Sequence, residues 1–225
     1  MSSTDTRTGW FASLVRRQYF WGIVAILLLL AINMTKDPRY LALSFNPANG
    51  ALVGNLVDIL RAAAPVMMIA IGMCLVIATS GIDLSVGSVM AVAGAVSMQF
   101  LATAPDTLGS ALLAVRLALG ISVVLGPFNG FMVSVVGLQP FISTLVMMMA
   151  GRGLAKVITS GQNTSAVNGH FRWIANGYLF GLPVVFLLAL LVVVLVGLLV
   201  RRSALGLMIE AIGMDPLAAR LAGIN

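Results

Sequence analysis

The hydrophobic positions of the chain fall into six long runs separated by short polar segments. The runs cover residues 19–34, 62–79, 84–101, 110–136, about 140–158 and 179–200. Most of them reach or approach the ~20 residues that an α-helix needs to cross a bilayer. The pattern therefore predicts an all-α fold, a polytopic transmembrane helical bundle of about six spans. If residues 62–101 form one broken element, the number of spans changes.

Composition and charge agree with a membrane protein. Of the 225 residues, 60% are hydrophobic and 9% are charged, whereas a soluble domain is about a quarter charged. Arg16 and Arg17 precede the first run, and Arg201 and Arg202 follow the last. Because such residues favour the cytoplasmic side, we expect a cytoplasmic segment at 1–18, a membrane domain at 19–200 and a cytoplasmic segment at 201–225. The net charge of +6 then reflects membrane topology and predicts no nucleic-acid partner.

A polar break separates the second run from the third. Residues 78–88 read Ala-Thr-Ser-Gly-Ile-Asp-Leu-Ser-Val-Gly-Ser, and a broken helix in a bilayer requires protein or a water-filled cavity around it. We expect Gly81 to supply the bend and Asp83 or Ser85 to cap the next helix, whose positive end favours the charge on Asp83. Two interpretations of Asp83 stay open: an N-cap at the membrane surface, or a direct substrate contact, as for other ionisable residues at membrane depth.

The fourth run carries the other candidate for a substrate pathway. Gly126-Pro127-Phe128-Asn129-Gly130 has glycines four apart, which favours close helix contacts, and a proline that kinks the helix and frees a carbonyl. Asn129 could satisfy such a group, or it could bond a substrate hydroxyl. The predicted substrate-pathway residues are Asp83, Ser85, Ser88 and Asn129.

The chain's last stretch predicts a short capped helix. Asp215-Pro216 is typical of an N-cap and first helical residue, and Gly223 is a favourable stop. A helix at 216–222, with Leu217 and Leu221 on one face, is too short to be stable alone. We expect it to occupy a groove in a partner; the alternative is a helix that lies on the membrane surface.

Several function classes are disfavoured by what the sequence lacks. It has no phosphate-binding loop of the form Gly-x-x-x-x-Gly-Lys-[Ser/Thr], so any ATP must be hydrolysed by a partner. Cys74 is the single cysteine and His170 the single histidine, and no metal site is expected. Of the seven acidic residues only Asp83 lies close to membrane depth, which disfavours an ion-coupled carrier. We expect a transporter subunit and not an enzyme.

Two motifs are specific in combination: Ile82-Asp83-Leu84-Ser85-Val86-Gly87, and Glu210-Ala211-Ile212-Gly213 with Ala218-Ala219 and Gly223-Ile224. With them, the chain from about residue 58 to 225 resembles the permease subunits of bacterial ABC sugar importers, in the ribose, xylose and galactofuranose branch and nearest to galactofuranose permeases. Further matches are Ala70-Ile71-Gly72-Met73, Phe128-Asn129-Gly130, Gln139-Pro140-Phe141 with Thr144-Leu145, and Gly151-Arg152-Gly153.

The resemblance implies a set of partners in the bacterial inner membrane. They are a second permease subunit, a cytoplasmic ABC ATPase that holds ATP and Mg, a periplasmic sugar-binding protein and the surrounding lipid. The substrate would be a pentose or a galactofuranose-like sugar. The resemblance also makes residues 210–223 the loop that couples to the ATPase, through Glu210, Ala211, Gly213, Asp215, Ala218, Ala219 and Gly223.

Members of the resembled family continue beyond such a loop through further membrane helices, including a glycine-rich segment. The chain stops at Asn225, so we expect a fragment or a truncated reading frame. The alternative functions are accordingly a non-transporting membrane remnant and, less favoured, an ion-coupled secondary carrier.

Overall fold

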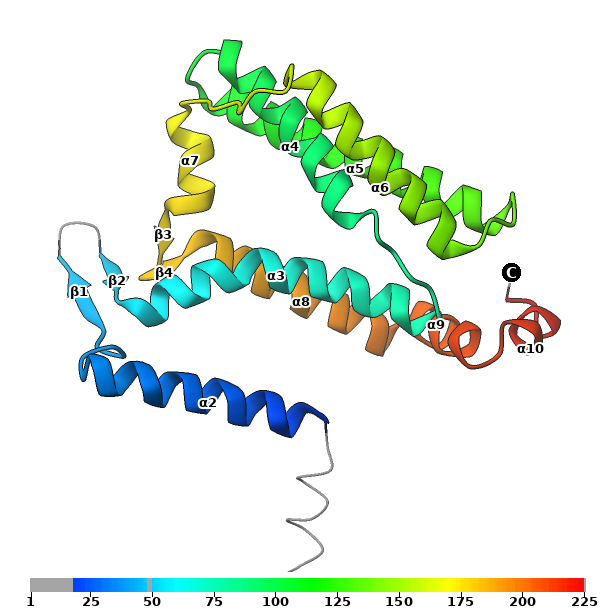
Figure 1. The fold of residues 1–225 in the computed structure, drawn as a ribbon, viewed down its shortest axis with the longest axis horizontal. Helices are drawn as coiled ribbons and strands as arrows, with labels where there is room; N and C mark the ends of the chain where they lie inside the picture. Colours follow the sequence, from blue (N-terminus) through cyan, green and yellow to red (C-terminus); the bar gives the residue numbers. More distant parts are fainter. Residues whose placement is uncertain (1–17, 48–49, 225) are drawn as a thin grey trace, which may run out of the picture. The chain divides into compact units, whose positions relative to one another are not determined.

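The computed structural model describes residues 18–47 and 50–224 (Figure 1). The chain divides into two compact units, residues 1–59 and 60–225. Residues 1–17, which make up most of the predicted cytoplasmic segment 1–18, and Asn225 lie outside the described residues. The first unit contains helix α2 (Gln18–Lys36) and an antiparallel hairpin of β1 (Ser44–Asn46) and β2 (Ala51–Val53). We expected only a loop between the first two spans, so this hairpin was not predicted.

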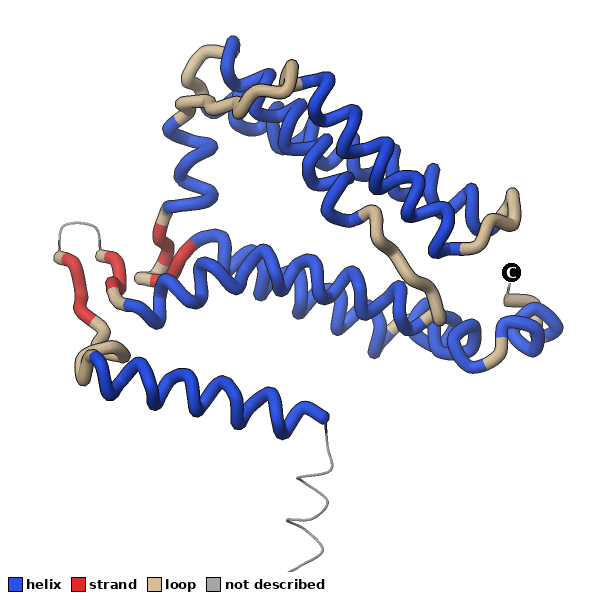
Figure 2. The backbone as a smooth tube through the Cα atoms, in the orientation of Figure 1, coloured by secondary structure: helices blue, strands red, loops and turns tan. Residues whose placement is uncertain are grey.

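The second unit is built from helices, with one very short hairpin (Figure 2). The helices, the first of which begins in the first unit, are α3 (Asn55–Ala78), α4 (Val86–Thr103), α5 (Leu108–Ser134), α6 (Pro140–Ile158), α7 (Gly169–Asn176), α8 (Val184–Arg202), α9 (Ala204–Met214) and α10 (Pro216–Leu221). Strands β3 (Tyr178–Leu179) and β4 (Leu182–Pro183) pair directly before α8.

Each of the six predicted runs contains a helix. Within the described residues, five helices are long and apolar enough to cross a membrane, namely α3, α4, α5, α6 and α8, while α2 is a shorter apolar helix over its described side chains. The predicted polytopic helical bundle is thereby confirmed. Two boundaries were wrong, and two helices, α7 and α9, were not predicted.

The first wrong boundary is the start of α3, which begins at Asn55, seven residues before the predicted start at residue 62. Residues 55–61 are thus part of the helix, and Pro65 lies inside it. The second is the start of α8. Phe180 and Gly181 both have positive φ, 53° and 81°, as the central residues of a type I′ hairpin turn do. Because this turn makes residues 178–183 a hairpin, α8 begins at Val184 and not at the predicted residue 179.

Helices α4, α5 and α6 pack side by side as the best-buried part of the second unit (Figure 1). Small side chains allow the close approach, and a buried serine bonds across one interface, where Ser97 Oγ donates to the carbonyl of Ala114 at 2.9 Å. Thr107 begins α5 as its N-cap and accepts a hydrogen bond from the amide of Ser110. The connection between α4 and α5 is short, so the two helices run antiparallel.

Candidate functional site

The polar break between α3 and α4 is organised by a helix stop at Ser80. The amide of Ser80 donates to the carbonyl of Ile77, and the amide of Gly81 donates to the carbonyl of Val76. This is the bonding of a Schellman motif, whose left-handed position is held by Ser80, with φ of 58°. The prediction that Gly81 supplies the bend was therefore wrong, because the residue with positive φ precedes it. Gly81 has little room for a side chain, since an added Cβ would lie 3.2 Å from the Val76 side chain and carbonyl.

Asp83 and Ser85 form a local turn directly before α4. Asp83 Oδ1 accepts a hydrogen bond from the amide of Ser85 at 2.7 Å and another from Ser85 Oγ at 2.6 Å. Ser85 occupies the N-cap position of α4, but its side chain makes no capping bond. The expected cap thus differs in detail: the carboxylate holds the N-cap residue and does not bond the amides of α4 itself. Asp83 is half-buried and Ser85 is buried.

Ser88 lies where α4 meets α6. Its side chain is fully buried, and Ser88 Oγ is 2.7 Å from the carbonyl of Ser85 and 3.2 Å from that of Met147. Gly151 faces it, and a Cβ on Gly151 would lie 2.9 Å from the Ser88 Cβ. The Ser88 hydroxyl therefore bonds protein carbonyls and joins two helices.

Asn129 is buried between α5 and α6. Its Oδ1 accepts a hydrogen bond from Ser143 Oγ at 2.6 Å. Both residues line a cavity of about 210 Å³, whose other walls are the apolar residues Phe128, Met132, Leu138, Ile142, Val146, Met147 and Ala150. Of the two interpretations of Asn129, the contact observed is the one with a protein group.

The first turns of α6 bring the two predicted clusters together. Ser143 bonds Asn129, while the next residue, Thr144, places Oγ1 2.8 Å from the carbonyl of Pro140 and 3.4 Å from that of Ile82, next to Asp83. Sequence reasoning did not select Ser143 or Thr144 as site residues. The signal was a pair of adjacent hydroxyl residues at the start of an otherwise apolar helix.

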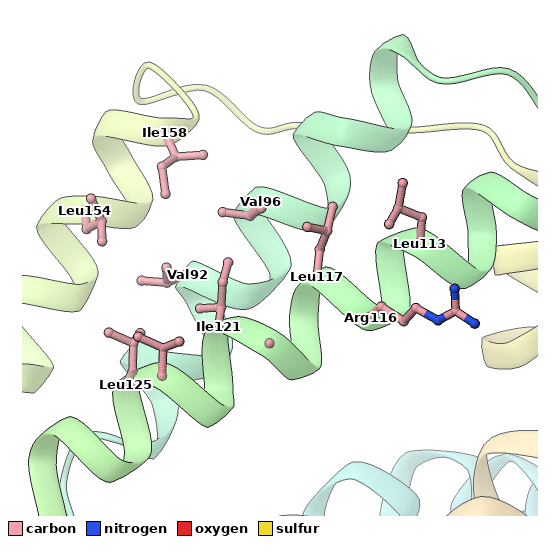
Figure 3. Close-up of a pocket in the computed structure, with 11 residues that line it drawn as sticks. Val92, Val96, Leu113, Arg116, Leu117, Ile121, Leu125, Leu154 and Ile158 are labelled. Carbon is pink, nitrogen blue, oxygen red and sulfur yellow. The ribbon is translucent and has the colours of Figure 1, made fainter.

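A second cavity, of about 450 Å³, lies among α4, α5 and α6 (Figure 3). Its lining is apolar apart from Arg116, whose guanidinium points away from the other side chains (Figure 3). The lining residues are Val92, Val96, Leu113, Arg116, Leu117, Gly120, Ile121, Val124, Leu125, Leu154 and Ile158. A polar solute finds few hydrogen-bond partners here, so this cavity does not suit one.

The predicted coupling segment, residues 210–223, includes the end of α9 and the whole of α10. Helix α10 has both of its expected caps. Asp215 Oδ1 accepts hydrogen bonds from the amides of Leu217 at 2.9 Å and Ala218 at 3.1 Å. Gly223 has φ of 86°, and the amides of Gly223 and Ile224 close the helix by bonding the carbonyls of Arg220 and Ala219. The predicted capped helix is confirmed, and it ends one residue earlier than expected, at Leu221.

Side chains of the coupling segment differ in what they contact. Ala219 is buried and Ala218 is exposed, while Leu217 and Leu221 are 69% and 85% exposed. In α9, Glu210 is exposed and Ala211 is half-buried. Gly213 packs against the last carbonyls of α3, where an added Cβ would overlap the Ala78 oxygen. The segment thus has one side turned to the protein and one side open.

Comparison with known proteins places these features in a family. Residues 55–225 match the family described as the branched-chain amino acid transport system / permease component. The chain belongs to this family. Its described residues contain no group of three or more His, Cys, Asp or Glu that could hold a metal ion. Together with the five apolar helices, the membership confirms the predicted multi-pass location in the bacterial inner membrane.

Curated relatives cover nearly the whole chain. It is 51% identical to the fructose import permease protein of Bifidobacterium longum over 91% of its length, and 42% identical to the galactofuranose transporter permease protein of Escherichia coli over 93%. The ribose import permease protein of Escherichia coli is 35% identical over 90%. The chain spans 58%, 61% and 60% of these relatives' lengths, respectively. No solved structure matches the chain.

Proposed function

We propose that this chain is the membrane-spanning permease component of an ATP-driven importer that moves a monosaccharide into the cell. One observation carries the proposal: relatives named as import permeases or transporter permeases for three sugars match about nine tenths of the chain. Fructose, galactofuranose and ribose can each adopt a small ring rich in hydroxyl groups. We therefore propose a monosaccharide of this kind as the substrate, which includes the pentose or galactofuranose-like sugar expected from the sequence.

The proposed partner on the cytoplasmic side is an ABC ATPase that binds ATP and Mg. Its docking element would lie in the coupling segment of α9 and α10, which contains Glu210, Ala211, Gly213, Asp215, Ala218, Ala219 and Gly223. The exposed leucines of α10 support this assignment, because a two-turn helix with both ends capped needs a groove to cover its apolar face. A second permease subunit and a periplasmic sugar-binding protein complete the proposed assembly.

The proposed sugar pathway involves Asp83, Ser85, Ser88 and Asn129. Three of these residues are buried, and the bonds of Ser88 and Asn129 join α4 and α5 to α6. Their contribution to the pathway would thus be to fix the helices that border it. Asn129 has the further property of lining a cavity, so it is the residue of this group that we propose for direct contact with a sugar hydroxyl.

Sugar uptake by a reconstituted system tests the proposal. A permease that includes this chain would be expressed with a candidate ABC ATPase and a candidate sugar-binding protein, in cells that lack their own fructose, ribose and galactofuranose importers. We expect accumulation of at least one of these radiolabelled sugars, abolished when the ATPase is inactivated. Uptake that persists with the inactive ATPase would contradict ATP-driven import.

We also propose that the loop between α6 and α7 faces the periplasm and that residues 201–225 face the cytoplasm, and cysteine labelling tests this orientation. In a Cys74→Ala background, a cysteine replaces either Val167, which is 88% exposed, or the exposed Ala222. An impermeant thiol reagent should label Val167→Cys in intact cells with an opened outer membrane. It should label Ala222→Cys only after the inner membrane is breached, and the reverse pattern would overturn the proposed orientation.

A further inference from the structure

The coupling segment meets the polar break through a close contact of backbones. In α9, Gly213 lies against the carbonyl of Ala78 at the end of α3, so closely that any Cβ at this position would overlap the oxygen. Glycine costs about 1 kcal/mol relative to alanine in a helix interior. At Gly213, glycine allows the backbones of α9 and α3 to approach more closely than any residue with a Cβ would permit.

A side-chain bond adds to the same contact. Ser80 Oγ donates a hydrogen bond of 3.1 Å to the carbonyl of Gly213. The last four carbonyls of a helix lack partners within the helix, and Gly213 is the penultimate residue of α9. Ser80 therefore satisfies one of the free carbonyls of α9. Its positive φ, unusual for a residue other than glycine, accompanies this bond.

Residues 79–85 connect this contact to α4, and hydrogen bonds restrict most of their backbone torsions. The Schellman motif fixes residues 76–81, and the carboxylate of Asp83 fixes Ser85 at the start of α4. Between them, the carbonyl of Ile82 lies 3.4 Å from Thr144 Oγ1 of α6. A displacement of α9 would therefore act on both α4 and α6, the helices that carry Ser88 and the partner of Asn129.

We propose that Ser80 and Gly213 are positioning residues that hold the coupling segment against the break at residues 78–85, so that movement of α9 and α10 reaches the start of α4. The inference rests on the proposed function. It adds that the two residues act through their contact with each other, although Ser80 is itself exposed. Gly213, which we expected among the coupling residues, would act inside the permease.

The test separates ATPase binding from coupling. The full chain, assembled with the ATPase and sugar-binding protein in proteoliposomes, is prepared with Gly213→Ala or Ser80→Ala. The measured quantities are the dissociation constant for the ATPase and the number of sugar molecules moved per ATP hydrolysed. We expect Ser80→Ala to lower this ratio roughly two- to tenfold, the factor that one hydrogen bond contributes to an equilibrium, with Gly213→Ala lower still. ATPase binding should stay within about twofold of the unmodified chain, a change smaller than one hydrogen bond would cause.

Three further variants make the result specific. Gly197→Ala places a methyl group in open space on α8, and Ser134→Ala removes an exposed serine that bonds within its own helix. Both should leave the ratio unchanged. Ser80→Asn should restore much of the ratio, because asparagine tolerates positive φ and its amide can donate to the same carbonyl.

The outcomes distinguish this inference from the proposed function. If the unmodified assembly moves no sugar, both fail. If the unmodified assembly moves sugar and the two variants keep the normal ratio of sugar to ATP, the positioning role is overturned and the proposed function stands. The same conclusion follows if the ratio falls only in proportion to a loss of ATPase binding. If Gly213→Ala does not insert into the membrane, Ser80→Ala and its rescue by asparagine decide the question by the same criteria.

Discussion

The interface between α4 and α6 and the surface of α10 are built from opposite kinds of residues. At the interface, Ser88 and Gly151 are both buried and lie against each other, and the Ser88 hydroxyl is within hydrogen-bond distance of two carbonyls. On α10, Leu217 and Leu221 are exposed although both are apolar. Within membranes, small and hydrogen-bonding residues hold helices together, because lipid removes most of the hydrophobic driving force between them. Outside the membrane, an exposed leucine face is instead typical of binding to a partner.

This difference separates residues that stabilise the chain from residues proposed to bind another. Substitutions at the interface should reduce the stability of the permease by itself. Substitutions on α10 should leave that stability unchanged and alter assembly. Thermal unfolding of the purified chain in detergent measures the changes in stability.

Gly151→Val should cause the largest loss, about 1–3 kcal/mol, the typical cost of overpacking a well-packed contact. Even a Cβ would lie 2.9 Å from Ser88 Cβ and 3.0 Å from Ser88 Oγ. The matched control is Gly153→Val on the same helix, where an added Cβ meets nothing within 4 Å. Equal effects of the two substitutions would show that α4 and α6 do not approach each other at Gly151.

Asp83→Ala should cost about 1 kcal/mol, as the loss of a side chain that fixes a helix start usually does. Both hydrogen bonds of Oδ1 to Ser85 disappear in this variant. Asp83→Asn keeps an oxygen that accepts hydrogen bonds, so it should be close to the unmodified chain in stability. If Asp83→Asn is stable but transports no sugar, the negative charge itself is required and the direct substrate contact of Asp83 gains support.

Asn129 and Ser143 should be coupled by about 0.6 kcal/mol, the average for such bonds within membranes. A double-mutant cycle with Asn129→Ala, Ser143→Ala and the double variant measures this coupling. The bond of 2.6 Å is buried between α5 and α6, so the second substitution should cost less once the first is present. Additive effects would mean that Asn129 Oδ1 and Ser143 Oγ do not bond each other.

Sequence reasoning predicted the elements that local chemistry specifies. The apolar runs located the membrane helices, and Asp215-Pro216 with Gly223 located α10 to within one residue, because caps depend on neighbours in the chain. The family resemblance, based on the motifs around Asp83 and Glu210, is confirmed by the match over residues 55–225.

The errors concern features that depend on distant residues or on turn geometry. A turn of the type at Phe180-Gly181 usually has asparagine, aspartate or glycine as its first central residue. Phenylalanine at this position gave no such signal. The positive φ of Ser80 accompanies a bond to Gly213, more than a hundred residues away. Likewise, the pairing of Asn129 with Ser143 requires the packing of α5 on α6. None of these partners follows from spacing in the sequence.

The smallest effect on stability is expected for the double substitution of Leu217 and Leu221 by glutamine. Their side chains are 69% and 85% exposed, and surface substitutions usually change stability by less than about 0.5 kcal/mol. Affinity for the ATPase should nevertheless fall at least roughly tenfold, since burying one leucine contributes about 1.5–3 kcal/mol. Ala222→Gln, at an exposed alanine next to α10, is the control and should change neither quantity greatly. A clear loss of stability in the double variant would mean that these leucines pack inside the permease, and α10 would then resemble the interface of α4 and α6 and not a surface that binds a partner.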